Sequence, residues 1–351
     1  MRIEELLEIT IGRKASDLHL LVGLPPILRI NGELFSIGEG EILSEEKIKD
    51  LVFSLLTEEQ KEILLVNKEI DFSFSYQEKG RFRVNAYHQK GTMAVALRLL
   101  PLTIPKIEEA NLPEICYQFA TLKQGFILVT GPTGHGKSTT LASIIEEINR
   151  TRPVHIITIE DPIEYVFSPK KAIISQREIR SDTHSWQIAL RSCLREDPDV
   201  VMIGEMRDYE TISSAITIAE TGHLVFATLH TNSAAQTIDR IIDVFPENQQ
   251  EQVKMQLSNT LEAILSQRLL PSLDGGRIPA FEILLATPAV RTSVREGNTH
   301  LIDNIIQTSF ELGMRTLEMD LARLVKQGKI SLEVARAYAQ RPEDLMRLIK
   351  K

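Results

Sequence analysis

The chain has few cysteines and no long apolar segment. Its 351 residues include only two cysteines, Cys116 and Cys193, which lie far apart in the sequence. Two cysteines are too few for a four-cysteine zinc site, and their low number favours a reducing compartment. Because no apolar run approaches the roughly 18 residues that span a bilayer, we expect no transmembrane helix.

The sequence also lacks an excess of positive charge and the features of a secretory signal. The formal net charge is −8, and no basic run offsets it. A stable nucleic-acid partner is therefore not expected. The first residues, 1–5, carry acids where a signal peptide has bases and an apolar core, so we expect a chain that is not exported. The length favours two or three domains.

Residues 1–100 predict a small α+β domain. Asn31-Gly32 lies between apolar alternations and is a strong signal for a β-hairpin. Ser44 can cap a helix. The apolar face of that helix consists of Ile48, Leu51, Val52 and Leu55. Alternating apolar and polar residues over 71–76 and 81–87 complete the pattern of an antiparallel sheet with a helix against one face.

Prolines at 101, 105 and 113 mark a linker over residues 101–113, and the pattern changes beyond it. Residues 114–351 alternate short apolar runs with helical segments. The runs are 126–130, 154–159, 199–203 and 224–229. Continuous apolar strands with helices between them indicate a parallel sheet covered on both faces, which is an α/β nucleotide-binding core. From about residue 280 the chain is expected to be helical.

Residues 131–138 match the phosphate-loop pattern G-x-x-x-x-G-K-[ST] between an apolar strand and a helix. Glycines permit backbone conformations in which successive N–H groups face one phosphate chain. The helix dipole, the Lys137 ammonium and the Ser138 hydroxyl can then hold the β- and γ-phosphates and Mg²⁺, so we predict that ATP binds here. The predicted binding residues are Gly131, Pro132, Thr133, Gly134, His135, Gly136, Lys137, Ser138 and Thr139.

Two acidic residues follow apolar strands, at the end where parallel sheets place their ligands. Glu205 follows the run 199–204, and Glu164 follows the run 155–159 with two further acids between. Either carboxylate could orient or deprotonate the attacking water while the other holds Mg²⁺ through a water. The alternative is a surface acid at a strand end, and a phosphate loop in the same sheet favours the catalytic interpretation.

Two histidines, His223 and His230, bracket the apolar run 224–229. Their spacing across a strand does not match a pair of zinc ligands. A lone histidine is often structural, whereas a position at a strand end beside a γ-phosphate favours a sensing role. The pattern alone leaves both interpretations open.

These four stretches, in this order, resemble the secretion-superfamily ATPases that drive type II and type IV secretion and type IV pili. Residues 159–164 resemble the Asp box of that family, residues 199–205 its Walker B strand and residues 222–231 its His box. The resemblance implies that Glu164 activates water and that Glu205 supports Mg²⁺ and water. It further implies that His223 and His230 sense the phosphate.

The resemblance covers nearly the whole chain and carries implications for fold and assembly. It implies a RecA-like ATPase core, a PAS-like N-terminal domain and a homohexameric ring on the cytoplasmic face of the inner membrane, where a platform protein of the pilus machinery would be its partner. Arg83 and Arg98 of the N-terminal domain would present their charges to the γ-phosphate. Gly204 stands where other phosphate-loop ATPases carry the aspartate that holds Mg²⁺, a departure typical of this family.

Within the family the chain is most similar to the ATPases that retract type IV pili. Residues 289–298 resemble their C-terminal motif A-I-R-N-L-I-R-E-G-K, with departures at Thr292, Ser293 and Asn298. The expected function is ATP-driven pilus retraction and twitching motility. The first rival is a pilus-extension or secretion-assembly ATPase, which usually has an additional N-terminal domain and a four-cysteine zinc site. Less favoured are a nucleic-acid translocase, because of the acidic charge, and a non-enzymatic scaffold, because the phosphate loop is intact.

Overall fold

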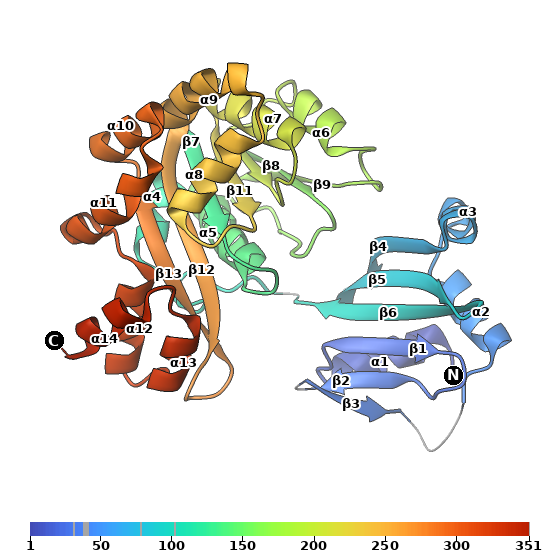
Figure 1. Ribbon diagram of the computed structural model, residues 1–351. Helices are drawn as coiled ribbons and strands as arrows, with labels where there is room; N and C mark the ends of the chain where they lie inside the picture. The colour runs from blue at the N-terminus through green and yellow to red at the C-terminus, as the bar shows by residue number, and fades with distance from the viewer. Residues whose placement is uncertain (31, 38–41, 78, 102, 351) are drawn as a thin grey trace. The chain divides into compact units, whose positions relative to one another are not determined.

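The computed structural model describes residues 1–351 except 31, 38–41, 78, 102 and 351 (Figure 1). The chain forms two compact units. The first contains Met1–Thr103 together with Pro162–Val166, and the second contains Ile104–Asp161 and Phe167–Lys351. The division at 103 lies inside the proline-marked segment 101–113, whereas the grouping of residues 162–166 with the first unit was not expected from the sequence.

The described part of the first unit contains an antiparallel sheet in the order β3-β2-β1-β6-β5-β4. Its strands are β1 (Asp17–Leu21), β2 (Ile27–Ile30), β3 (Glu33–Ser36), β4 (Glu69–Tyr76), β5 (Gly80–Gln89) and β6 (Thr92–Leu100). Its helices are α1 (Ile3–Gly12), α2 (Glu45–Phe53) and α3 (Glu58–Asn67). Buried side chains of the helices and of one sheet face form a single core, which leaves the other face polar.

Local signals in the first unit behave as predicted. The Ser44 hydroxyl accepts a hydrogen bond from Lys47 N and caps α2. The four residues of its predicted apolar face are buried, namely Ile48, Leu51, Val52 and Leu55. Strands β2 and β3 pair as a hairpin with Ile30 opposite Glu33, and Asn31 of the predicted turn lies outside the described residues.

The second unit contains a mainly parallel sheet in the order β13-β12-β7-β11-β10-β8-β9. The strands are β7 (Gly125–Thr130), β8 (His155–Glu160), β9 (Ile173–Glu178), β10 (Val200–Ile203), β11 (Leu224–Leu229), β12 (Leu261–Pro271) and β13 (Arg277–Leu285). All four predicted strands are present, and the α/β fold with a parallel core is confirmed. The sequence prediction missed β9, β12 and β13. Helix α9 ends at Thr260 and β12 begins at Leu261, so no turn signal separates them.

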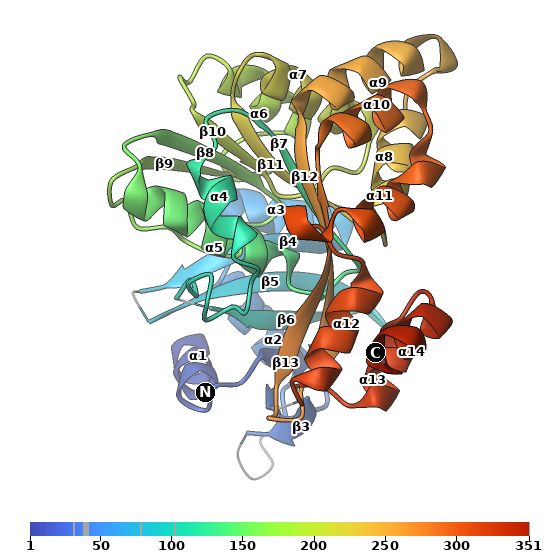
Figure 2. The ribbon, with the colours of Figure 1, turned by 90° about the vertical axis from the view of Figure 1, so that its left-hand side faces the viewer.

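Helices lie on both faces of this sheet, with α4 and α5 on one side and α8 to α10 on the other (Figure 2). The helices that precede the C-terminal region are α4 (Ile115–Thr121), α5 (Lys137–Thr151), α6 (Trp186–Cys193), α7 (Tyr209–Glu220), α8 (Ala234–Asp243) and α9 (Glu247–Thr260). Residues of α6 to α10 share one buried cluster with the parallel strands. Because these strands are buried on both faces, they read as continuous apolar runs.

The C-terminal region is helical as predicted, although it starts at Pro288 because β13 continues to Leu285. It contains α10 (Pro288–Glu296), α11 (Ile302–Thr308), α12 (Leu317–Lys326), α13 (Leu332–Tyr338), α14 (Pro342–Lys350) and short 3₁₀ turns at Thr299–Leu301 and Phe310–Leu312. Gly328 has φ +67° just after α12, and the Ser331 hydroxyl caps α13. Among the described residues, no helix is long and apolar enough to cross a membrane.

Candidate functional site

The site lies at the carboxyl ends of neighbouring parallel strands. Strand β11 pairs in parallel with both β7 and β10, and β10 pairs in parallel with β8. The segments that follow these strands therefore emerge at one edge of the sheet. The phosphate loop follows β7, Glu205 follows β10 and His230 follows β11. The sequence predicted that these groups follow strands of one sheet, and the parallel pairing of β7, β11 and β10 brings them to the same edge.

The phosphate loop needs glycine where its backbone approaches β12. Gly131 has φ +142°, and a Cβ there would lie 2.4 Å from the carbonyl oxygen of Gln267. Gly136 has φ +83° and is the residue before α5. Helix α5 begins at Lys137, so Ser138 and Thr139 lie in its first turn. The backbone N–H groups at the start of a helix can bind an anion.

Lys137 is 8% exposed and is folded over its own loop. Its Nζ donates to the carbonyl oxygens of Gly131 at 2.8 Å and Pro132 at 3.0 Å. The same ammonium lies 3.4 Å from His230 Nδ1, and Thr133 Oγ1 lies at the same distance from that nitrogen. The loop, its lysine and the end of β11 are therefore in contact.

His230 links the phosphate loop to Glu205. Its Nε2 lies 2.7 Å from Glu205 Oε1, while Nδ1 faces the Lys137 ammonium. This arrangement fits a ring that donates from Nε2 and accepts at Nδ1. Arg207 binds the Glu205 carboxylate with two hydrogen bonds, Nε to Oε1 at 2.6 Å and Nη2 to Oε2 at 2.8 Å.

Glu205 is held in its charged form by these neighbours. Partial burial opposes ionisation, but the hydrogen bonds and charges of Arg207 and His230 outweigh it and keep the pKa of Glu205 below its ordinary value. The carboxylate is therefore fully ionised near neutral pH. It also lines an open cavity of about 420 Å³ with Thr133, Met206 and Arg240 among its walls.

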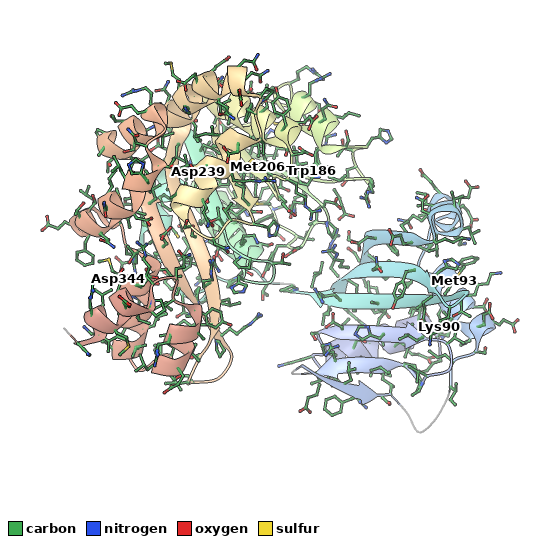
Figure 3. All side chains as sticks on the ribbon, viewed as in Figure 1. Lys90, Met93, Trp186, Met206, Asp239 and Asp344 are labelled. Carbon is green, nitrogen blue, oxygen red and sulfur yellow. The ribbon has the colours of Figure 1, made fainter. Side chains whose placement is uncertain are left out.

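Gly204 is explained by the space around it. A Cβ at this position would lie 3.3 Å from Glu160 Cα and Ile159 O in β8, and 3.6 Å from the Trp186 ring. Trp186 and the neighbouring Met206 are labelled in Figure 3. An aspartate at 204 would have to displace the adjacent strand, so the first acid that this strand can present is Glu205.

The structure places His223 at the other end of β11 from His230, and its phosphate-sensing role stays a prediction. His223 precedes β11, and its carbonyl accepts from Gly125 N at the start of β7. It therefore lies at the amino edge of the sheet, a whole strand away from His230. Its Nδ1 contacts Ile218 O and Thr221 Oγ1, which fits a local structural role at the end of α7.

Glu164 lies in a segment that follows β8 and leaves the second unit. Residues 162–166 group with the first compact unit, and the Glu164 side chain is half-buried. Glu160, the last residue of β8, is buried and accepts a hydrogen bond from Thr158 Oγ1 at 2.7 Å. The role of Glu164 as the water-activating acid stays a prediction.

Arg83 and Arg98 lie opposite each other on β5 and β6 of the first unit. Arg83 Nη2 is 2.6 Å from Asp71 Oδ2, and Arg98 Nε is 2.9 Å from Asp17 Oδ1. The Arg98 side chain is 66% exposed, so its guanidinium is reachable from solvent. The action of both arginines on a nucleotide also stays a prediction.

Sequence reasoning missed the contribution of β12 to the site. Gln267 and Arg268 are buried beside the phosphate loop. Arg268 Nη2 donates to Asn232 O at 3.0 Å, in the loop that follows His230. The available signal was the polar triplet 266–268 inside an otherwise apolar run, because buried polar residues need specific partners.

Comparison with known proteins agrees with the interpretation of this site as that of an ATPase. The profile of the type II/IV secretion system protein family matches residues 67–276. The type IV pilus retraction ATPase PilT of Pseudomonas aeruginosa is 45% identical over 98% of this chain and 100% of its own length. A crystal structure of the pilus retraction motor PilT with bound ADP is 47% identical, with a TM-score of 0.93 over 99% of both chains.

The ATPase DotB of Legionella pneumophila is more distant, at 31% identity and a TM-score of 0.80 over 95% of this chain and 94% of its own. The similarity to these proteins extends over nearly the full length of the chain. This chain therefore belongs to the type II/IV secretion system protein family, and its core is that of a phosphate-loop ATPase.

Proposed function

We propose that this chain is an ATP-hydrolysing motor that powers retraction of type IV pili. One observation carries the enzymatic part, the continuous contact from Lys137 through His230 to Glu205 at the carboxyl edge of the sheet. The pilus part is supported by the 45% identity to the PilT retraction ATPase over almost the whole chain. ATP binds in the cup of N–H groups at the start of α5, with Lys137 on its β- and γ-phosphates.

The oxygen donors at this edge suit Mg²⁺ that arrives with the nucleotide. No cluster of three or more His, Cys, Asp or Glu side chains that could hold a metal occurs in the described ranges. Mg²⁺ usually keeps several waters and binds through substrate phosphates and one or two protein oxygens. The Ser138 hydroxyl and, through water, the Glu205 carboxylate are the proposed protein ligands.

Glu205 is the proposed acid that orients water and Mg²⁺, with Glu164 as the water-activating residue by family resemblance. The Arg207 guanidinium binds both oxygens of Glu205, so it competes with a proton or a water for that carboxylate. His230 would report the γ-phosphate, because its Nδ1 faces Lys137.

Arg83 and Arg98 are proposed to stabilise the charge that develops on the γ-phosphate, in a homohexameric ring. Each guanidinium is paired with a carboxylate of its own unit, which holds it on the polar face of the sheet. An arginine that acts on the transferred phosphate in this way, called an arginine finger, contributes about 10³-fold or more to turnover. Attachment to an inner-membrane platform protein at the pilus base, on its cytoplasmic side, completes the proposed assembly.

We predict that Glu205→Gln keeps ADP binding and lowers the turnover number by about 10²-fold or more, because the amide keeps the shape but loses the charge and the base. Steady-state ATPase assays and ADP titration of the purified variant measure both. Glu220→Gln, the same change at the exposed end of α7, is the control. Wild-type turnover in Glu205→Gln would remove this residue from the mechanism.

Helix α10, the segment that resembles the retraction motif, is proposed to couple hydrolysis to pilus movement. Val290 and Val294 lie on one face of the helix, and both are fully buried in the core of the second unit. Replacing them with alanine would cost on the order of 2 kcal/mol each. They are therefore unsuitable for separating coupling from folding.

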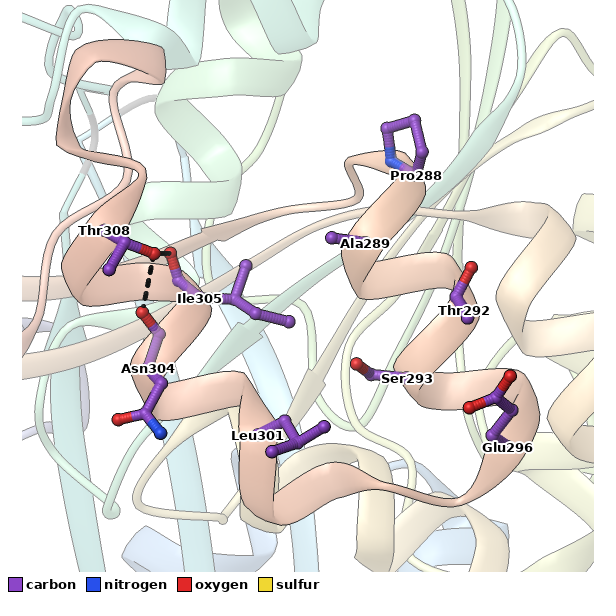
Figure 4. A pocket seen from close by; sticks show the side chains of 9 residues that line it. All are labelled: Pro288, Ala289, Thr292, Ser293, Glu296, Leu301, Asn304, Ile305 and Thr308. Carbon is purple, nitrogen blue, oxygen red and sulfur yellow. Dashed lines mark hydrogen bonds between the residues drawn. The ribbon is translucent and has the colours of Figure 1, made fainter.

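The opposite side of α10 offers a better probe. An open groove of about 620 Å³ lies between α10 and the segment 301–308, and its residues are shown in Figure 4. The α10 residues that line it are Pro288, Ala289, Thr292, Ser293 and Glu296. Arg291 faces elsewhere, because its guanidinium binds Glu262 and the carbonyls that end α9.

We expect Thr292→Arg to fill this groove, to leave the ATPase rate within about two-fold and to abolish twitching motility, since surface substitutions away from a core change stability little. Thr217→Arg on the exposed face of α7 is the matched control. Motility and ATPase activity are measured for the same variant. Normal motility, or an ATPase loss as large as the motility loss, would remove a separate coupling role from α10.

Deletion of the gene for this chain tests the direction of force. We expect cells with many surface pili that do not retract, counted by electron microscopy and followed by fluorescence labelling of pili. Restoration of normal pilus number by the wild-type gene is the control. Cells without pili would identify the chain instead as an extension or assembly ATPase.

A further inference from the structure

Strand β12 extends past the end of its neighbour and runs beside the phosphate loop. β7 ends at Thr130, which pairs with Ser266, whereas β12 continues to Pro271. The side chains of Thr130 and Ser266 are hydrogen-bonded at 2.8 Å where the two strands part. Beyond this point the loop takes the place of a strand against β12.

Gln267 binds the loop and the following helix at the same time. Its Nε2 donates to His135 O at 2.8 Å, and its Oε1 accepts from Thr140 Oγ1 of α5 at 2.6 Å. The residue is only 2% exposed, so water cannot readily replace these bonds. One buried side chain therefore fixes the loop relative to the helix that it opens.

The Gln267 bond also determines where a loop N–H points. In a trans peptide the C=O of one residue and the N–H of the next face opposite ways. Since the His135 carbonyl is held toward β12, the Gly136 N–H is turned to the other side, which is the cup that receives phosphate. Gly136 itself leaves room for the amide of Gln267, because a Cβ at Gly136 would lie 3.0 Å from Nε2.

His135 adds a second attachment. Its Nδ1 accepts from Leu269 N at 3.0 Å, on the side of β12 where β7 has ended. Burial, aided by the charges of Arg268, Lys137 and Arg277, keeps the pKa of His135 below its ordinary value. The ring is therefore neutral at neutral pH, and Nδ1 can accept the hydrogen bond from Leu269 N. The ring also lies 6.3 Å from the ring of Tyr338 in α13, which connects the loop to the C-terminal helices.

We propose that Gln267 and His135 form a clamp that holds the phosphate loop in its anion-binding shape from strand β12, and that they are positioning residues for the nucleotide. This proposal rests on the proposed function, because it concerns ATP and ADP at the same loop. The clamp acts on binding of the phosphate chain before chemistry begins. It therefore predicts an effect on KM and on ADP affinity rather than on the turnover number.

The test compares ADP affinity and ATPase kinetics of Gln267→Met, His135→Ala and His135→Asn with those of the wild type. Methionine keeps the length of glutamine without a donor, and asparagine keeps an acceptor near the position of Nδ1. We expect Gln267→Met and His135→Ala to weaken ADP binding and to raise KM by about 10-fold each, as loss of a buried hydrogen bond implies. His135→Asn should retain clearly more ADP affinity than His135→Ala, and in all three variants the change in KM should exceed the change in kcat.

Two further measurements keep the test decisive. Since both contacts fix the same peptide segment, the double variant Gln267→Met with His135→Ala should lose less than the sum of the single losses in binding free energy. Gln118→Met on the exposed surface of α4 is the control for the side-chain change. If Gln267→Met does not fold, the two His135 variants carry the test, because His135 is a partly exposed loop residue.

Wild-type ADP affinity in both Gln267→Met and His135→Ala would overturn the clamp, and so would a fall in kcat at unchanged KM. Equal losses in His135→Ala and His135→Asn would overturn the role of the Nδ1 acceptor. Failure of the ATPase part of the proposed function looks different, because the wild-type protein itself would then neither bind ADP nor hydrolyse ATP.

Discussion

The site depends on one constraint, the parallel register of β7, β11 and β10. It sends the phosphate loop, His230 and Glu205 out of the sheet at the same edge. Once they emerge together, short contacts follow, with Lys137 against His230 and His230 against Glu205. A slip of one strand by two residues would move its terminal group by about 7 Å and break this chain of contacts.

The same edge combines rigid and movable parts. The loop is fixed from β12 by Gln267 and Leu269, and its glycines accept that close approach. Glu205, by contrast, is covered by Arg207, whose side chain is 78% exposed and free to move into solvent. Charge on a γ-phosphate would compete for that arginine and for Lys137. Nucleotide binding and the release of Glu205 can therefore be coupled through the exposed Arg207 and the buried Lys137 while the sheet stays unchanged.

The fold class, the phosphate loop and Glu205 could be predicted from the sequence, because the patterns that indicate them are local. The phosphate loop is a contiguous motif, and Ser44 caps a helix that the neighbouring residues also favour. Glu205 was found because an acid follows a buried strand. The fold class followed from continuous apolar runs separated by helices.

Other features could not be predicted from local patterns. The six-residue strand β11 separates His223 from His230 by about 20 Å, so the two side chains lie at opposite edges of the sheet, which the spacing of the pair does not indicate. Strand β12 was missed because it follows α9 directly, and with it the partners of the loop were missed. Gln267 lies more than a hundred residues from the loop it holds, and only the fold brings them together. The placement of Glu164 depends on a segment that leaves the sheet and groups with the other unit.

Whether hydrolysis at the phosphate loop drives the motor is tested by measuring pilus retraction in a deletion strain that expresses Lys137→Ala from a plasmid. Lys137 carries the charge that the β- and γ-phosphates require, and alanine cannot replace it. We expect a folded protein present at the wild-type level, with surface pili abundant and no retraction events. Normal retraction with this variant would contradict the claim that hydrolysis at this loop drives the motor.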